Sequence, residues 1–94
     1  MIYELAFHQD ALDEWRRLDP SVRNAFKKKL TECLANPRVP SAKLSGHPDR
    51  YKIKQKKIGY RLVYEVRDTE VVVVVIAVGK RKRNAVYGAA AKRR

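Results

Sequence analysis

The sequence predicts an α+β fold of order βααβββ, with two antiparallel helices packed on a mostly antiparallel four-stranded sheet and a short C-terminal helix. Apolar side chains recur at helical spacing only between residues 10 and 36. Residues 51–79 instead alternate between apolar and polar, or are continuously apolar, and turn residues divide them. At 94 residues the chain has the size of one small domain, and we expect residues 1–94 to form it.

One strand and two helices are predicted in the N-terminal part. Residues 2–7 alternate in the manner of a short strand, and Asp10 is placed to cap a first helix. Asp19 and Pro20 form a second helix start, with proline at the first helical position, where its missing N–H is no loss. The second helix should end at the Asn-Pro pair, residues 36–37.

Three strands are predicted in the C-terminal half, after a loop over residues 38–49 that contains two prolines and a glycine. They cover residues 51–54, 60–66 and 71–78. Gly59 and the sequence RDTE mark the two turns between them. The last of these strands is apolar at both odd and even positions, which predicts a central strand covered on both faces. The sequence NAVYGAAAKRR then predicts a short helix with a basic tail.

The positive charge is concentrated in the second half of the chain. The formal net charge is +12, and residues 50–94 hold 14 basic and three acidic side chains against eight and seven in residues 1–49. This asymmetry favours a polyanionic partner, either nucleic acid, an anionic membrane surface or an acidic protein. The alternative is a basic surface that only keeps the protein soluble, but repulsion among so many like charges opposes folding.

The composition also indicates where the protein resides. With one cysteine, Cys33, no intrachain disulfide can form, which fits a reducing compartment. Cys33 lies on an apolar helical face and is expected to be core. The N-terminus does not have the pattern of a signal peptide, and the longest apolar run is far shorter than the roughly 20 residues of a membrane helix. We therefore expect a soluble, cytoplasmic protein. We also expect it not to bind membranes, because the basic residues lie on predicted strands and not along an amphipathic helix.

Alternation along the first two C-terminal strands separates cations from apolar side chains. Lys52 and Lys54 share one face, and Tyr51 and Ile53 share the other, which should pack on the helices. Arg61 on the next strand can join the lysines if the turn register permits, although it could instead pair with Glu65. Such a cluster of like charges is unfavourable unless an anion lies between them, and lysine and arginine make most protein contacts to phosphate.

Chemistry on RNA requires more than a basic surface. Cleavage by the 2′-hydroxyl of the substrate needs a base, an acid for the 5′-oxygen and cations that stabilise the phosphorane. A lysine can be the base if neighbouring cations lower its pKa, and arginine suits forked phosphate contacts. His8 and His47 stand apart and are expected at the surface. No metal-ligand spacing or nucleotide-binding glycine motif is present, so we expect no metal and no cofactor.

Two segments, KLSGHPDRYKIKQKKIGYRLVYEV and VVVVVIAVGKRKRNAVY, resemble the RelE family of bacterial type II toxins, part of the RelE/ParE superfamily. The resemblance covers essentially the whole chain, including ALDEWRRLDPSVRNAFKKKL in the helices. It implies a toxin that cleaves mRNA in the ribosomal A site without a metal and inhibits translation. Its partners would be the 70S ribosome and a RelB-like antitoxin with an acidic, partly disordered segment, and DNA would be contacted only through the toxin–antitoxin complex.

Carried over position by position, the resemblance implies five catalytic residues. Lys52 and Lys54 would supply the general base and phosphate contacts, and Arg61 would stabilise the transition state. Arg81 would assist the leaving group, and Tyr87 would stack on or orient the nucleotide, unless it only anchors the terminal helix. Many superfamily nucleases have a histidine before the arginine matched by Arg81, where this chain has a lysine, so which of the two lysines and Tyr87 is the base stays open.

Other cations are assigned to binding. The RNA or phosphate contacts are expected from Lys43, Lys56, Lys57, Lys80 and Arg83. The lysines Lys27, Lys28 and Lys29 form either a solvated helix face or a contact to the ribosome. Two alternative functions share the fold or the charge. One is a ParE-like inhibitor of DNA gyrase, which does not need the five catalytic residues, and the other is a non-catalytic RNA-binding protein of ribosomal type.

Overall fold

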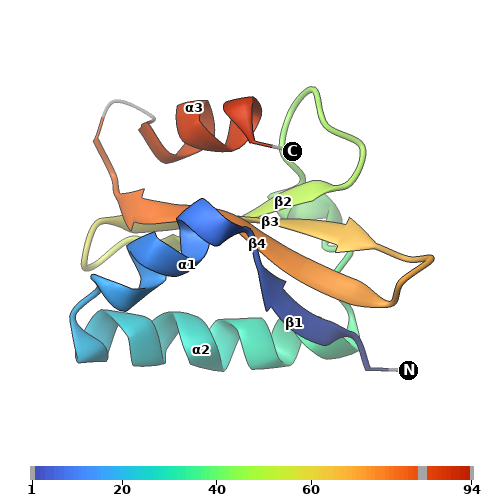
Figure 1. Cartoon of the computed structure of the whole chain (residues 1–94), viewed down its shortest axis with the longest axis horizontal. Coiled ribbons are helices and arrows are strands. Elements are labelled where there is room, and N and C mark those ends of the chain that lie inside the picture. The colour runs from blue at the N-terminus through green and yellow to red at the C-terminus, as the bar shows by residue number, and fades with distance from the viewer. Residues whose placement is uncertain (1, 83–84, 94) are drawn as a thin grey trace.

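The computed structural model describes residues 2–82 and 85–93. It has three layers, with the long helix α2 (Pro20–Ala35) below the sheet and the short helix α3 (Ala85–Lys92) above it (Figure 1). The strands are β1 (Glu4–Phe7), β2 (Arg50–Gln55), β3 (Tyr60–Arg67) and β4 (Val72–Lys80). The helices are α1 (Gln9–Arg16), α2 (Pro20–Ala35) and α3 (Ala85–Lys92), with one 3₁₀ turn at Pro40–Ala42. The predicted α+β fold and its element order are confirmed.

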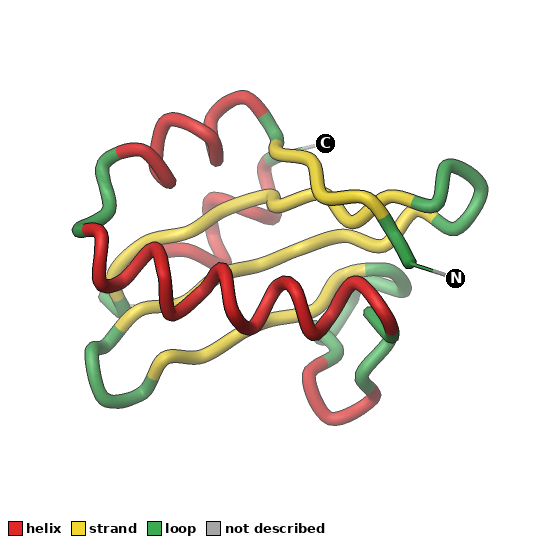
Figure 2. The backbone as a smooth tube through the Cα atoms, turned by 90° about the horizontal axis from the view of Figure 1, so that it is seen from below, coloured by secondary structure: helices red, strands yellow, loops and turns green. Residues whose placement is uncertain are grey.

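The sheet has the strand order β1-β4-β3-β2. β1 runs parallel to β4, whereas β2–β3 and β3–β4 are antiparallel hairpins. Because β1 pairs only with residues 72–75, the outer edge of β4 is open beyond them, and α1 lies alongside that edge. Figure 2 shows that the chain then turns back, so that α2 runs antiparallel to α1 along the sheet.

The helix starts agree only in part with the sequence interpretation. Asp19 caps α2 as predicted, since its carboxylate accepts from the Ser21 backbone N–H at 3.3 Å and Pro20 is the first helical residue. The predicted cap of α1 was wrong. His8 is the N-cap, its Nδ1 accepts the backbone N–H of Asp10 at 3.1 Å, and Asp10 lies inside the first turn. An imidazole nitrogen replaces the carboxylate oxygen as acceptor for an N–H that the helix leaves free.

The two faces of the sheet carry separate apolar clusters. The larger one, toward α1 and α2, centres on Phe26, Leu30 and Tyr64, and the Tyr64 hydroxyl donates to the Pro37 carbonyl at 2.7 Å. Cys33 is partly buried against it, in line with its expected role as core. The smaller cluster, toward α3, contains Val63, Val74, Ile76, Ala77, Val86 and Ala90. β4 is therefore covered on both faces, as its continuous apolar run predicts.

A β-bulge interrupts the pairing of β3 with β4. Tyr64 pairs with Val75 but Val63 pairs with Ala77, so Ile76 is an extra residue in β4. Up to Val75 the odd-numbered residues of β4 face α1 and α2. After the bulge they face α3, since Ile76 and Ala77 both belong to the smaller cluster. Every residue beyond the bulge thus points to the opposite side from the one that simple alternation predicts.

A buried arginine on β2 is bonded to a carboxylate on β3. Arg50 is 6% exposed and donates through Nε to Glu65 at 3.0 Å, and Arg67 binds the second oxygen of Glu65 at 2.8 Å. Burial alone would raise the pKa of Glu65, but the hydrogen bonds from Arg67 and Arg50 outweigh it and lower the pKa below the ordinary value of 4.5.

Among residues 2–82 and 85–93, no helix combines the length and apolarity needed to cross a membrane.

The lowered pKa of Glu65 predicts a pH-dependent contribution to stability. The carboxylate contributes fully above about pH 4.5, and the contribution is lost as the pH falls through the lower pKa of the folded state. In urea titrations across this range, the unfolding free energy of the wild type should fall more steeply with decreasing pH than that of Glu65→Gln. Equal slopes for the two proteins would contradict this assignment.

Among the non-glycine residues that the structure describes, Val71 alone has a positive φ, of +57°, and it lies in the turn before β4. A β-branched residue is strained in this region, whereas asparagine adopts it readily. Val71→Asn should therefore raise the unfolding free energy by about 1 kcal/mol in urea titrations. Glu70→Asn, in the same turn but without positive φ, is the matched control and should give no gain. A Val71→Asn protein no more stable than the control would show that the strain is compensated.

Candidate active site

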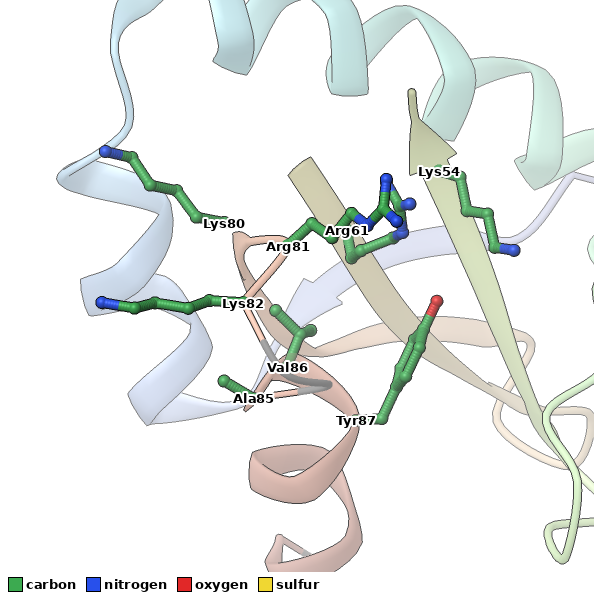
Figure 3. Close-up of a pocket in the computed structure, with 8 residues that line it drawn as sticks. All are labelled: Lys54, Arg61, Lys80, Arg81, Lys82, Ala85, Val86 and Tyr87. Atoms are coloured by element: carbon green, nitrogen blue, oxygen red, sulfur yellow. The ribbon is translucent and has the colours of Figure 1, made fainter. Parts of the chain in front are cut away.

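A hollow of about 200 Å³ lies between the α3 side of the sheet and the start of α3. In Figure 3 the side chains of Arg61 and Arg81 lie close together and the Tyr87 hydroxyl points toward them, while Lys54 lies at the edge of the hollow with its ammonium directed away from the two arginines. They come from β2, β3, the end of β4 and α3, so four separate elements contribute to this constellation. The remaining lining residues are Lys80, Lys82, Ala85 and Val86. Four of the five predicted catalytic residues therefore meet at one place.

The pairing of the strands explains this convergence. Lys54 is directly opposite Arg61 in the β2–β3 hairpin, and Arg61 is opposite Gly79 in the β3–β4 pair. Residues opposite one another share a face, so the condition that the turn register must bring Arg61 to the lysines is met. The bulge in β4 turns Gly79, and with it Arg81, to this same face. The backbone N–H of Arg81 is fixed by a 2.6 Å bond to the Gly59 carbonyl in the β2–β3 turn.

Electrostatics in the hollow act most strongly on Lys54. The positive charge of Lys52 is the main cause that lowers its pKa, followed by desolvation and then by Arg61, Lys56 and Arg81. Each of these makes the charged ammonium less favourable. Lys54 thus has the environment of a lysine that can give up its proton more easily than a free one.

Arg61 is only 8% exposed, which is unusual for a charged residue. Within the described residues its guanidinium makes one hydrogen bond, from Nη1 to the Tyr60 carbonyl at 3.0 Å. The alternative pairing with Glu65 does not occur, because Glu65 binds Arg50 and Arg67. The guanidinium therefore keeps most of its donors for an anion in the hollow.

Tyr87 brings a phenol to the hollow from the first turns of α3. Its ring packs against the smaller apolar cluster and its hydroxyl points toward Arg61 and Lys54 (Figure 3). The hydroxyl oxygen is buried, and no partner for it exists among the described residues. Buried polar atoms are normally hydrogen-bonded, so this hydroxyl is suited to a ligand or substrate group. Tyr87 both helps to anchor α3 and faces the site, so the two interpretations of the sequence are compatible.

Comparison with known proteins agrees with this geometry. Residues 5–85 match the sequence profile described as the ParE toxin of the type II toxin–antitoxin system parDE. The mRNA interferase toxin RelE of Escherichia coli K12 is 56% identical over 93 residues, which cover 99% of this chain and 98% of the relative. An mRNA interferase RelE of Shigella flexneri matches equally well. The chain belongs to the RelE family of type II toxins.

Solved structures of other RelE toxins have the same fold as this RelE-family chain. A double arginine mutant of E. coli RelE in the free state superimposes with a TM-score of 0.90 at 53% identity, over 98% of this chain and 97% of that one. RelE in the intact E. coli RelBE toxin–antitoxin complex gives a TM-score of 0.82 at 56% identity, over 86% and 99%. The archaeal RelE of the Pyrococcus horikoshii RelE–RelB complex, at 22% identity, has a TM-score of 0.65 and supports the fold alone.

The fifth predicted catalytic residue of this RelE-family toxin lies next to the hollow. Lys52 lines a neighbouring groove of about 340 Å³ between α2 and β2, together with Lys29, Lys54 and apolar side chains. Lys56 and Lys57 line a third groove of about 490 Å³ between α2 and the β2–β3 turn, and Lys54 and Lys29 line this groove as well. Lys54 thus stands where the three hollows meet, whereas Lys52 acts on the first through its charge.

The remaining predicted binding residues are less closely connected to the hollow. Lys80 lines it, but its side chain points away from Arg61 in Figure 3. Lys82 also lines the hollow and points away from Arg61, and the sequence interpretation did not name it as a binding residue. Lys82 could have been suspected from the basic run in which it stands. Lys43 is exposed in the segment before β2. Lys27 and Lys28 are exposed on α2, and Arg83 lies outside the described residues. In the described part of the chain, no three His, Cys, Asp or Glu side chains are grouped as a metal would require.

The cause of the low Lys54 pKa can be tested in this RelE-family toxin. Lys52→Ala removes the largest repulsion, so it should move the pKa of Lys54 upward toward the ordinary value of 10.5. The pKa is measured by NMR titration of the Lys54 side chain with selectively labelled lysine. Lys43→Ala, which removes an exposed lysine that does not contribute to the shift, is the control. An unchanged Lys54 pKa in Lys52→Ala would contradict the electrostatic cause.

Proposed function

We propose that this RelE-family toxin is an endoribonuclease that cleaves mRNA in the ribosomal A site by attack of the substrate 2′-hydroxyl. The observation that carries the proposal is the convergence of Lys54, Arg61, Arg81 and Tyr87 on one hollow. The names of the relatives support it, since proteins 56% identical over almost the whole chain are mRNA interferases. The gyrase-inhibitor alternative would not require this cluster, and no observation in the hollow favours it.

Arg61 and Arg81 would hold the scissile phosphate. Both guanidinium groups lie on the same face of the sheet, one from β3 and one from the end of β4. Arg61 is buried and its free donors are fixed in the hollow before substrate arrives, so little reorganisation accompanies charge development on the phosphorane. Arg81 would stabilise the 5′-oxygen as it leaves, either as a cation or as the proton donor.

The proton transfers need a base and an acid. In its neutral form Lys54 would take the proton of the 2′-hydroxyl, the 2′-oxygen would bond to phosphorus, and the bond to the 5′-oxygen would break. The departing oxygen would take a proton, leaving a 2′,3′-cyclic phosphate and a 5′-hydroxyl. The lowered pKa of Lys54 supports this role, and Lys52 would favour it through repulsion. Tyr87 would stack on a base or direct its hydroxyl to the nucleotide.

Dependence on the ribosome follows from what the hollow contains. No histidine or carboxylate lines it among the described residues, so the proton shuttle is weak and alignment of the substrate must supply much of the rate. The exposed lysines of α2 and the β2–β3 turn would contact ribosomal RNA or the message. Polyanion binding by such residues should weaken with salt.

The proposed partner outside the ribosome is a RelB-like antitoxin. Other RelE toxins have been solved in complexes with RelB, including the intact E. coli RelBE complex and a RelE mutant with a RelB peptide. The net charge of +11 in residues 50–94 would favour an acidic segment that folds across the basic face. DNA would be contacted only through that complex, and the site of action would be the cytoplasm.

The function is tested by primer extension on a defined mRNA programmed into 70S ribosomes. The wild type should cut in the A-site codon, and Arg61→Ala should slow single-turnover cleavage by about a hundredfold or more, because a preorganised charge donor is lost. Arg81→Ala and Lys54→Ala should also be strongly impaired. Arg17→Ala, which removes an exposed cation at the end of α1 that does not line the hollow, is the control and should cut nearly normally.

Three results would contradict the proposal. Intact mRNA with wild-type protein would exclude the nuclease and lead to a gyrase supercoiling assay. Equal cutting of ribosome-free RNA would exclude ribosome dependence. A gradual, salt-dependent loss of binding in every lysine and arginine variant, without cleavage by any of them, would indicate the non-catalytic RNA-binding protein.

A further inference from the structure

Helix α3 brings Tyr87 to the site, and its apolar contacts to the sheet come from Val86, Tyr87, Ala89 and Ala90. It is eight residues long, and an isolated helix of that length is marginal in water. Its fully buried side chains are Val86 and Ala90, and Val86 packs over Gly79 at the site. Two arginines make polar contacts near the C-terminal end of the helix, and these contribute to where it lies.

Arg50 makes the first of these contacts. From the start of β2 its Nη1 donates to the Ala90 carbonyl and its Nη2 donates to the Arg93 carbonyl at 2.6 Å. The last carbonyls of a helix lack the usual backbone N–H donors, although that of Ala90 also accepts the Arg93 backbone N–H at 3.1 Å, and a cation there interacts favourably with the helix dipole. Because Nε of Arg50 is bound to Glu65, the guanidinium is held from the sheet side. Arg50 thus connects the end of α3 to β2 and β3.

Arg93 makes the second contact, to the opposite edge of the sheet. Its Nη1 donates to Glu14 of α1 at 2.7 Å and to the Ile76 carbonyl of β4 at 2.9 Å, and its Nη2 donates to Glu14 at 3.1 Å. Glu14 in turn accepts the backbone N–H of Val78 at 3.2 Å. These bonds occupy the open edge of β4 beyond its pairing with β1. The arginine is well buried, with 16% of its side chain exposed.

We propose that Arg50 and Arg93 are positioning residues for Tyr87, and that they hold α3 so that the phenol stays in the active site. This inference rests on the proposed function. Lys54, Arg61 and Arg81 lie on or directly after the sheet strands, and their positions do not depend on the end of α3. Tyr87 reaches the hollow only through α3. Loss of either arginine should therefore reduce the contribution of Tyr87 and leave the phosphate contacts intact.

A double-mutant cycle tests this dependence. Arg93→Ala should lower the single-turnover cleavage rate on programmed ribosomes by about tenfold, the order expected for loss of hydrogen bonds to a charged group. The ribosome concentration for half-maximal rate should stay within about twofold. In a Tyr87→Ala background, the same Arg93→Ala change should alter the rate by less than about twofold, because the side chain through which it acts is already removed.

The controls separate positioning from general destabilisation. Arg38→Ala removes a comparable arginine, bonded to Asp49 at 3.0 Å and Asp68 at 2.8 Å near the other end of β4, and it should leave the rate unchanged. Arg93→Lys keeps the charge opposite Glu14 and should recover most of the rate. Thermal unfolding of each variant verifies that the protein is folded at the assay temperature.

A second measurement does not depend on nuclease activity. In the free protein labelled with 3-fluorotyrosine, the ¹⁹F signal assigned to Tyr87 should shift toward the solvent-exposed position in Arg50→Ala and Arg93→Ala, and amide exchange of residues 86–92 should accelerate. Arg38→Ala should change neither. An unperturbed Tyr87 signal, or an equal loss of rate by Arg93→Ala with and without Tyr87, would overturn the proposal. If the wild type does not cleave RNA, the proposed function fails and the ¹⁹F result still decides the position of α3.

Discussion

The register shift between β3 and β4 is the constraint on which the site depends. Strand pairing alone places Lys54 beside Arg61, but it would leave Arg81 on the side of α1 and α2. The extra residue Ile76 reverses the alternation for the remainder of β4. It also allows Ile76 and Ala77 together to form the surface on which α3 lies. A single inserted residue thus determines both which cation enters the hollow and what covers it.

The separation of charge along the sheet is a second consequence of the fold. The three acidic residues of the C-terminal half, Glu65, Asp68 and Glu70, line one hollow near the β3–β4 turn, where Arg38 and Arg67 accompany them. The other end of the same strands carries the cations of the candidate active site, and no carboxylate lines that hollow among the described residues. The electrostatic field of the protein is therefore directed along the strands, and it should attract a polyanion to the end where Arg61 and Arg81 lie.

Much of this organisation could be predicted from the sequence, because it follows from local periodicity. Alternation was enough to place Lys52 and Lys54 on one face of β2 and Tyr51 and Ile53 on the other. The residues of NAVYGAAAKRR were enough to predict α3. The bulge leaves no such signal, since Val75, Ile76 and Ala77 are all apolar. Alternation would therefore choose Lys80 over Arg81 as the residue that faces the site. Arg50 shares the alternation of Lys52, but two of its three acceptors are carbonyls 40 or more residues away, which periodicity cannot identify.

The burial of Arg61 links anion binding at the hollow to the folding stability of this toxin. A guanidinium that is largely withdrawn from water and has a single bond within the described chain raises the free energy of the folded state. Any anion that supplies the missing acceptors lowers that free energy by mass action, whether it is a phosphate or a carboxylate. The melting temperature should consequently rise with the concentration of such anions. If the proposed antitoxin supplied a carboxylate to Arg61, its binding would therefore also protect the folded toxin against unfolding.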